Sequence, residues 1–328
     1  MPDSNLDLVQ AYLSNVQFAL QNFDVVCAES FLEHALALLP QTCIPFPFSL
    51  PMQIDVGVGL DTGMQRKGRP NEDFVFATTG YSIPTQQAYG IFVVADGMGG
   101  HANGKEASQL ATETIVDMIF PLVRNERVQG PEIGAILVDA AKQANAALYE
   151  RNLKMTRLLD RMGTTAIIAL VVGPHAFIAN IGDSRAYLYR PGVGLRVLSQ
   201  DHSIVAALTA SGAITPDEVY THPERNKVLR CLGTAPTVDV DLFYEQLQNG
   251  DTLLLCSDGL WEMVRDPQIE QLLASPWCSA EQTAKRLVNA ALRGGGLDNI
   301  GLVVSQFQMH ITAMQTLICS VSDYPTAS

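Results

Sequence analysis

The sequence predicts an α+β fold in which antiparallel sheets pack together and helices cover their outer faces. Hydrophobic residues make up 47% of the 328 residues, which is enough for a large buried core. Two apolar stretches, residues 164–172 and 175–181, are separated only by Gly173 and Pro174, as in a β-hairpin. Long helical patterns stand between groups of such strands, so alternating βαβ units are not expected.

Ahead of this hairpin, the sequence predicts three strands followed by two long helices. Alternating or continuous apolar residues place the strands at residues 53–58, 74–76 and 89–94. Helical spacing covers residues 105–120, and we expect Pro121 to end that helix because proline cannot donate to the hydrogen-bond ladder. Pro131 opens the second helix, which is predicted to extend at least to Tyr149.

After the hairpin, strands surround a polar excursion and alternate with a final pair of helices. Strands are predicted at residues 185–189, 195–198, 238–244, 252–256 and 300–304. Residues 201–233 are more polar and are broken by Gly212, Pro216 and Pro223, so we expect a short helical flap outside the sheets. The last two helices are predicted at residues 267–273 and 280–292.

The first 50 residues differ in pattern from the rest of the chain. Apolar residues recur at three- and four-residue steps over residues 6–23, which predicts an amphipathic helix, and a second helical stretch covers residues 29–39. A proline-rich connector follows. The apolar stripe can dock on the following domain or receive a partner, and docking is the simpler expectation because an exposed stripe lowers solubility. We therefore divide the chain into an N-terminal extension, a main domain and a C-terminal tail, at residues 1–50, 51–310 and 311–328.

Composition argues against several kinds of partner. The formal net charge of −13 disfavours nucleic acids and anionic membranes, since both bind basic surfaces. No apolar run reaches the roughly 20 residues of a membrane span, and the acidic N-terminal residues do not resemble a signal peptide. The six cysteines show neither a CxxC pair nor zinc spacing, as is typical of a reducing cytoplasm. We expect a cytoplasmic protein that acts as a monomer.

Four aspartates stand where apolar strands begin or end. Any one of them alone would be a turn residue or a helix cap, but the four together indicate a metal site. We expect them to converge on one edge of a sheet, and the small Gly97 lets its carbonyl approach the same cation. Carboxylates without His or Cys partners suit hard ions such as Mg²⁺ and Mn²⁺ rather than zinc. The aspartates are Asp73, Asp96, Asp258 and Asp298.

At these residues the chain resembles the metal-dependent serine/threonine protein phosphatases of type 2C, in their bacterial form. The matching segments keep the family's order: NED at 71–73, ADGMGGH at 95–101, GTT at 163–165, GDSR at 182–185, SDGLW at 257–261 and DNI at 298–300. The resemblance implies a four-layer α-β-β-α sandwich with metals between the sheets at one end. It also implies that a metal-bridged water hydrolyses phosphoserine and phosphothreonine on phosphoprotein partners.

The resemblance assigns metal ligands residue by residue. Asp96 bridges two Mg²⁺ or Mn²⁺ ions, and the Gly97 carbonyl holds one of them. The remaining acids, which complete the pair directly or through water, are Asp73, Asp258 and Asp298.

A third, weaker ion is the usual partner of the aspartate in GDSR, which is Asp183 here. The alternative is that Asp183 is simply a turn residue between two strands. The family often has a further acid four residues after the SDG aspartate, and this chain has Glu262 there. Glutamate is one methylene longer than aspartate, so the geometry of a third ion stays open.

The resemblance also points to groups that act on the substrate. His101 is a candidate general acid for the departing Ser or Thr oxygen, or a structural residue beside a helix. Arginine suits phosphate, and RKGRP offers Arg66 and Arg69, because the family spacing falls on Gly68. A short insertion makes Arg66 the counterpart, and a slipped loop makes it Arg69. We prefer Arg66, which follows a turn and precedes Lys67 as in the family.

Two other functions stay open. A catalytically weak relative could bind phosphoproteins as a scaffold, although such a protein should have lost metal aspartates and this chain has all four. A metal-dependent phosphatase could instead act on a small phosphorylated substrate, because a metal centre does not recognise what lies behind the phosphate. The flap at residues 201–233 is where that choice would be made.

Overall fold

The computed structural model describes residues 52–82, 85, 87–98, 103–125, 130–157, 160–275 and 278–309. The expectations for the N-terminal extension, the C-terminal tail and His101 lie outside these residues. No helix in the described part of the chain is long and apolar enough to cross a membrane.

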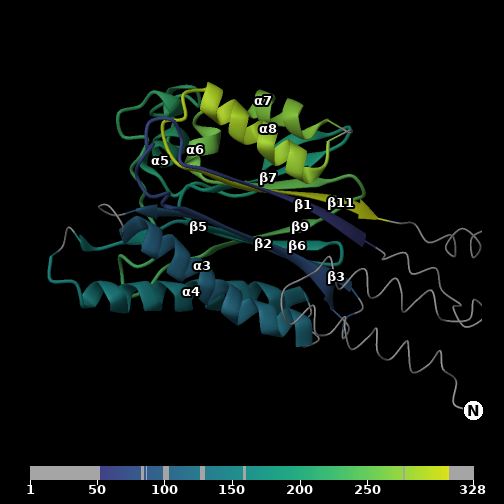
Figure 1. Cartoon of the computed structure of the whole chain (residues 1–328), viewed down its shortest axis with the longest axis horizontal. Helices are drawn as coiled ribbons and strands as arrows, with labels where there is room; N and C mark the ends of the chain where they lie inside the picture. Colours follow the sequence, from purple (N-terminus) through teal and green to yellow (C-terminus); the bar gives the residue numbers. More distant parts are fainter. Residues whose placement is uncertain are drawn as a thin grey trace, which may run out of the picture. The chain divides into compact units, whose positions relative to one another are not determined.

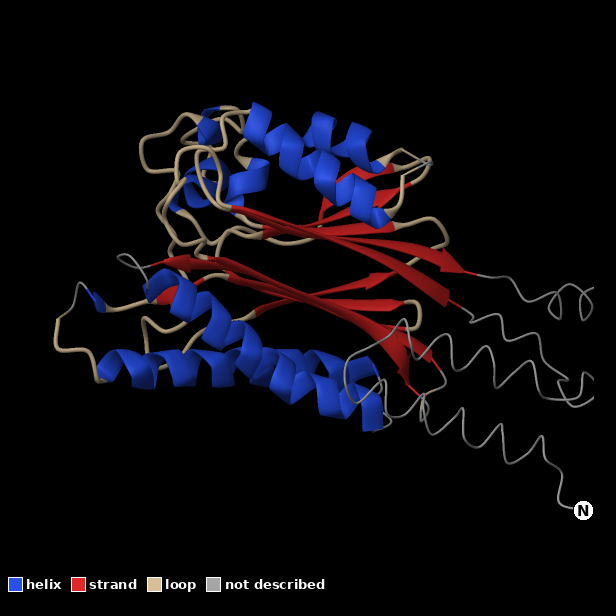
Figure 2. Ribbon diagram, in the orientation of Figure 1, coloured by secondary structure: helices blue, strands red, loops and turns tan. Residues whose placement is uncertain are grey.

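Two antiparallel sheets stack face to face, and helices cover both outer faces (Figure 1, Figure 2). The first sheet has the order β1-β11-β10-β7-β8, with the bounds Met52–Asp61, Ile300–Met309, Thr252–Cys256, Arg185–Arg190 and Gly194–Val197. The second has the order β2-β3-β5-β6-β9, with the bounds Asp73–Ser82, Gln87–Met98, Ala166–Val172, His175–Ile181 and Asp241–Gln246. The short β4 (Gly163–Thr164) pairs with the end of β3.

The helices complete the four layers. Two long helices, α3 (Asn103–Asn125) and α4 (Gly130–Leu153), lie on the second sheet, whereas α7 (Asp266–Leu273) and α8 (Ala280–Arg293) lie on the first (Figure 2). The predicted α+β sandwich is confirmed. Residues 201–233 stand outside the sheets and contain the shorter α5 and η3, at Ile204–Ala210 and Glu218–Tyr220.

Three apolar clusters hold the layers together, one between the sheets and one between each sheet and its helices. The central strands therefore bury both of their faces. All seven residues of β5, AIIALVV, are buried. This explains why the central strands read as continuous apolar runs, while the edge strand β9 alternates between half-buried and exposed residues.

Several predicted boundaries differ from the structure, and two of the differences have a clear physical cause. Pro121 lies inside α3, which continues to Asn125. The buried Ile119 and Val123 pack in the same apolar cluster on either side of the proline, and this packing offsets the hydrogen bond that proline cannot make. The strand predicted at residues 164–172 is divided, because Thr165 turns to bond with Asp96 between β4 and β5.

Two buried asparagines of α4 fix the end of the flap region. Asn152 donates to the carbonyls of Met162 and Gly233 at 2.7 and 2.9 Å, and it accepts from the Met162 N–H at 2.9 Å. Asn145 accepts from the Gly233 N–H at 2.8 Å. The backbone next to Gly233 pairs in turn with Thr164, so these amides brace β4.

We expect Asn152→Ala to lower the free energy of unfolding by about 2–4 kcal/mol, because it leaves buried backbone groups without partners. Gln143, which is exposed on the same helix, offers a matched control, and Gln143→Ala should change stability by less than about 0.5 kcal/mol. Urea denaturation followed by circular dichroism measures both. A loss below about 1 kcal/mol for Asn152→Ala would contradict the expectation, because it is less than the usual cost of one unpaired buried polar group.

Candidate functional site

Each sheet brings two aspartates to the same end of the sandwich. Asp73, the first residue of β2, pairs directly with Asp96 of β3 in the second sheet. Asp258 opens the short helix α6 (Asp258–Trp261) just after β10, and Asp298 precedes β11, the neighbour of β10 in the first sheet. The expectation that all four meet at one edge of a single sheet is therefore wrong. They meet between the ends of two sheets, as the family resemblance implied.

A cavity of about 260 Å³ opens where these strand ends meet. It brings together most of the predicted site residues and adds others from the flap. Its lining consists of Arg66, Glu72, Asp96, Gly97, Met98, Thr165, Asp183, Asn226, Val228, Asp258 and Asp298. Asp73 does not line the cavity but lies behind it, with 3% of its surface exposed.

Gly97 is required by the close approach of other backbone segments. A Cβ at this position would lie 2.0 Å from the Gly104 carbonyl oxygen in the first turn of α3 and 2.7 Å from the Glu72 carbonyl oxygen. Any larger residue would push α3 away from β2 and β3. The glycine thus lets the helix pack at the cavity wall.

Burial of so many acids raises their pKa values. Removal from water raises the pKa of Asp73 to about 7, and hydrogen bonds from Ser257 and Asp96 offset this only in part. Burial also raises the pKa of Asp183 to about 7, with repulsion from Asp201 as the next cause. The pKa of Asp96 lies well above its usual value, through burial first and then repulsion by the neighbouring aspartates.

Several carboxylate oxygens in this region have no hydrogen-bond partner within the described residues. These buried atoms are Asp73 Oδ1, Asp258 Oδ1 and Glu72 Oε1. Unpaired buried acceptors of this kind are costly unless a cation satisfies them. In the described part of the chain, no three His, Cys, Asp or Glu side chains are arranged to hold an ion unaided. Ions here would also need carbonyl and water ligands, which suits Mg²⁺ and Mn²⁺.

Arg66 supplies the positive charge that faces these acids. Its guanidinium donates to Glu72 Oε2 at 2.9 Å and to Asp298 Oδ2 at 2.7 Å. The side chain remains about one-third exposed, at 32%, so it is accessible from the cavity. Arg69 is exposed and does not line the cavity. The structure therefore brings Arg66, and not Arg69, to the site.

Ser257 and Thr165 orient the acids, and the sequence alone assigned them no role. Ser257 Oγ donates to Asp73 Oδ2 at 2.6 Å and accepts from the Gly301 N–H at 3.0 Å. Thr165 Oγ1 accepts from the Asp96 N–H at 3.0 Å. Thr165 belongs to the GTT motif and Ser257 to the SDGLW motif. Membership in these motifs was the only sign in the sequence that the two residues matter. Glu72 was likewise visible in NED, but its contact with Arg66 was not.

The flap reaches the cavity through Asn226 and Val228 and is held from behind by Glu262. The Arg225 Nε lies 3.5 Å from Glu262 Oε2, and the glutamate side chain is only 9% exposed. Asp183 is buried, and its carbonyl accepts a hydrogen bond from the Trp261 indole at 3.0 Å. In this structure Glu262 therefore contacts the flap and does not line the cavity with Asp183.

Histidines near the site have structural partners. His202 Nδ1 accepts from the Gly182 N–H at 3.0 Å and so fixes the turn that carries Asp183. His222 Nδ1 accepts from the Glu224 N–H at 3.2 Å within the flap. His101, the candidate general acid, lies outside the described residues.

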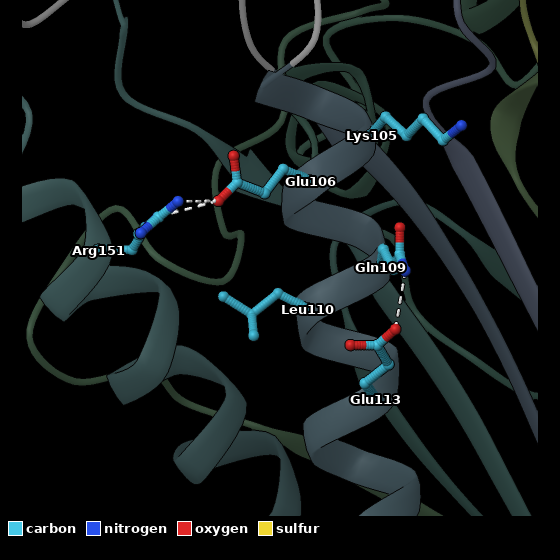
Figure 3. Close-up of a pocket in the computed structure, with 6 residues that line it drawn as sticks. All are labelled: Lys105, Glu106, Gln109, Leu110, Glu113 and Arg151. Atoms are coloured by element: carbon cyan, nitrogen blue, oxygen red, sulfur yellow. Dashed lines mark hydrogen bonds and ion pairs between the residues drawn. The ribbon is translucent and has the colours of Figure 1, made fainter.

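Two larger hollows do not compete with the acidic cavity. A groove of about 490 Å³ lies between α3 and α4 (Figure 3). Both of its acids are paired, Glu106 with Arg151 at 2.7 Å and Glu113 with Gln109 at 2.8 Å. A second hollow of about 420 Å³ lies beside the flap and is lined by Arg185, whose guanidinium is bonded to Asp201. Neither gathers unpaired acids.

Comparison with known sequences gives consistent matches. The model of the protein phosphatase 2C family matches residues 62–294. The serine/threonine protein phosphatase PstP of Mycobacterium tuberculosis is 36% identical over 245 residues, which are 75% of this chain and 43% of that protein. The serine/threonine phosphatase stp of Listeria monocytogenes is 38% identical over 216 residues, 65% of this chain and 83% of that protein.

Solved structures agree with the sequence matches. The crystal structure of the Mycobacterium tuberculosis phosphatase PstP has a TM-score of 0.67 at 35% identity and covers 78% of this chain and 99% of that chain. A structure of the PstP catalytic domain in complex with two manganese ions has a TM-score of 0.65 at 34% identity, with the same coverage. The serine/threonine phosphatase of S. agalactiae gives 0.67 at 28% identity, covering 79% of this chain and 100% of that chain.

The chain spans less than half the length of the mycobacterial relative, at 43%, but almost all of the solved catalytic domain, at 99%. The match is thus with a domain that carries the same sandwich and the same ordered motifs. Because the family model covers most of the sequence and bacterial members of known structure share its fold, the chain belongs to the protein phosphatase 2C family.

Proposed function

We propose that this protein hydrolyses phosphoserine and phosphothreonine on proteins in a reaction that needs Mg²⁺ or Mn²⁺. The observation that carries the proposal is the cavity between the sheet ends, where buried acids repel each other and several of their oxygens have no hydrogen-bond partner among the residues that the structure describes. The similarity to serine/threonine phosphatases of Mycobacterium tuberculosis and Listeria monocytogenes and to the manganese-bound PstP structure supports it.

The acids of the cavity would hold two ions, with Asp96 between them. Asp73, Asp258, Asp298 and the Gly97 carbonyl complete the ligands, directly or through water, and Asp183 is the candidate for a third ion. Two divalent ions supply an activated water and neutralise phosphoryl oxygens. Ser257 and Thr165 keep the acids in place through the bonds described above.

Arg66 is our candidate for binding the substrate phosphate. It lines the cavity, stays partly exposed and is oriented by Glu72. A planar guanidinium can donate two parallel hydrogen bonds to phosphate, which lysine cannot. We keep His101 as the candidate proton donor to the leaving oxygen.

The cellular setting is also a proposal. We infer a cytoplasmic signalling enzyme that acts as a monomer on phosphoproteins and not on nucleic acids or membranes, and the net charge of −13 supports this. The scaffold alternative predicts no turnover. The small-substrate alternative predicts turnover of small phosphate esters but not of phosphopeptides.

The first test concerns turnover. Hydrolysis of p-nitrophenyl phosphate and of a phosphothreonine peptide should require Mn²⁺ or Mg²⁺ and should stop in EDTA. Asp96→Asn should lower kcat by roughly three orders of magnitude or more. Asp117→Asn is the matched control, because Asp117 is an exposed acid on α3, and it should behave as wild type. Full activity in EDTA would contradict the proposal.

The second test concerns stability against pH without metal. The raised pKa values of Asp73 and Asp183 mean that the fold favours their protonated forms. Their contribution to stability is full below the unfolded value near 4 and is lost as the pH rises through about 7. In EDTA, each such group should lower the free energy of unfolding by about 1.4 kcal/mol per pH unit in this window.

Denaturant titrations between pH 4.5 and 7.5 measure this slope. Asp73→Asn should reduce the slope of the unfolding free energy against pH by the contribution of one group. Asp117→Asn should leave the slope unchanged. Mn²⁺ should raise Tm more at pH 7.5 than at pH 5, because ligands must lose their protons to bind a metal. A stability that rises with pH in EDTA would show that burial does not govern these acids.

The third test separates the two arginines. At saturating Mn²⁺, Arg66→Ala should mainly raise KM. The increase should correspond to about 1.5–3 kcal/mol of lost binding free energy, because charge-assisted contacts are removed. Arg69→Ala is the control and should have little effect, since Arg69 is exposed outside the cavity. Equal effects of the two changes would mean that neither arginine has a specific role in binding phosphate.

A further inference from the structure

Two large apolar side chains are exposed in the segments that also line the charged cavity. Met64 is 49% exposed and Leu297 is 45% exposed. Each lies close in sequence to a residue that lines the cavity, Met64 to Arg66 and Leu297 to Asp298. Single exposed apolar residues are common on protein surfaces, so their arrangement, and not their exposure, decides whether they matter.

Several bonds join the two loops that carry them. The N–H groups of Met64 and Gln65 both donate to the Gly296 carbonyl, at 2.8 and 3.1 Å. The Asn299 side chain donates to the Thr62 carbonyl at 3.0 Å. Together with the ion pair of Arg66 with Asp298 at 2.7 Å, these contacts hold the two chain segments side by side.

The Met64 side chain lies against Gly296, and the Leu297 side chain lies against Gly295. A Cβ on Gly296 would lie 3.0 Å from Met64 Cγ and 3.2 Å from Leu292 Cδ2. A Cβ on Gly295 would lie 3.6 Å from Met263 Sδ and 3.7 Å from Leu297 Cδ2. The half-buried Leu292 and Met263 belong to the core under α7 and α8. We call Met64, Leu297, Leu292 and Met263 the apolar ledge.

We propose that the apolar ledge binds a large apolar side chain of the substrate, within three residues of the phosphorylated one. The inference rests on the proposed function, since it describes how that site would select phosphoproteins. The ledge is continuous with the cavity through Arg66 and Asp298, and an extended peptide advances about 3.3 Å per residue. A neighbour of the phosphoresidue can therefore reach the ledge while its phosphate is in the cavity.

The chemistry of the ledge favours this occupant over a charged one. Its methionine and leucine side chains offer only dispersion contacts and the burial of apolar area. Methionine also adapts to ligands of different shape. Two exposed basic residues, Lys67 and Arg293, lie near the ledge in sequence, and the partly exposed Asp298 follows Leu297 directly. An apolar neighbour of the phosphoresidue matches the uncharged side chains of the ledge itself.

The test uses the full chain with Mn²⁺ and a set of phosphothreonine peptides. Each peptide carries one leucine in an alanine and serine background, at positions from three before to three after the phosphothreonine. The wild-type protein should prefer leucine at one or two of these positions by roughly tenfold in kcat/KM, the effect of burying one apolar side chain. Met64→Ser combined with Leu297→Ser should remove that preference.

The same double variant should hydrolyse p-nitrophenyl phosphate and the leucine-free peptide within about twofold of wild type, since surface changes rarely disturb the fold. Leu153→Ser is the matched control, because Leu153 is 61% exposed at the end of α4, and it should keep the preference. An unchanged preference in the double variant would overturn the proposal. So would a wild-type protein that hydrolyses all peptides equally.

Two further outcomes are distinguishable. A lower Tm of the double variant, with equal losses on every substrate, would mean that the ledge is covered by the chain's own residues, and this would also overturn the proposal. A wild-type protein that hydrolyses p-nitrophenyl phosphate but no phosphopeptide would contradict the proposed function itself.

Discussion

The structure depends on one electrostatic constraint, the crowding of acids between the ends of two sheets. Asp73 and Asp183 are almost fully buried, and burial, followed by repulsion from neighbouring aspartates, raises the pKa values of Asp96 and Asp258. Among the described residues that line the cavity, Arg66 is the one cation. Such an arrangement is unfavourable without counter-ions, because several of the buried carboxylate oxygens have no hydrogen-bond donor among the described residues.

The two-sheet sandwich makes this arrangement possible. Neighbouring strands fix Asp73 opposite Asp96 through their register, and β10 and β11 do the same for the segments that carry Asp258 and Asp298. The apolar strands behind them bury both faces and form a rigid support. The unfavourable charges therefore stand at strand ends, where loops can be shaped for function without disturbing the core.

Local patterns predicted most of the fold and indicated the strand-end aspartates that the structure places around one cavity, but they did not predict contacts between distant segments. Strands such as β5 and β6 follow from residue type and one turn, and the aspartates follow from their position at strand ends. Pro121 was misjudged because packing of its helix against the sheet outweighs the local cost of proline. The contact of Asn226 with the cavity depends on how the flap folds back, which no local pattern encodes.

The proposed phosphate contact and the proposed peptide contact lie on one pair of loops. The segment after β1 carries both Met64 and Arg66, and the segment before β11 carries both Leu297 and Asp298. The Gly296 carbonyl and the Arg66–Asp298 ion pair tie these segments together. A side chain bound on the ledge would thus contact the same segments that position Arg66, the proposed phosphate ligand. This coupling gives substrate contacts outside the cavity a physical route to its chemistry.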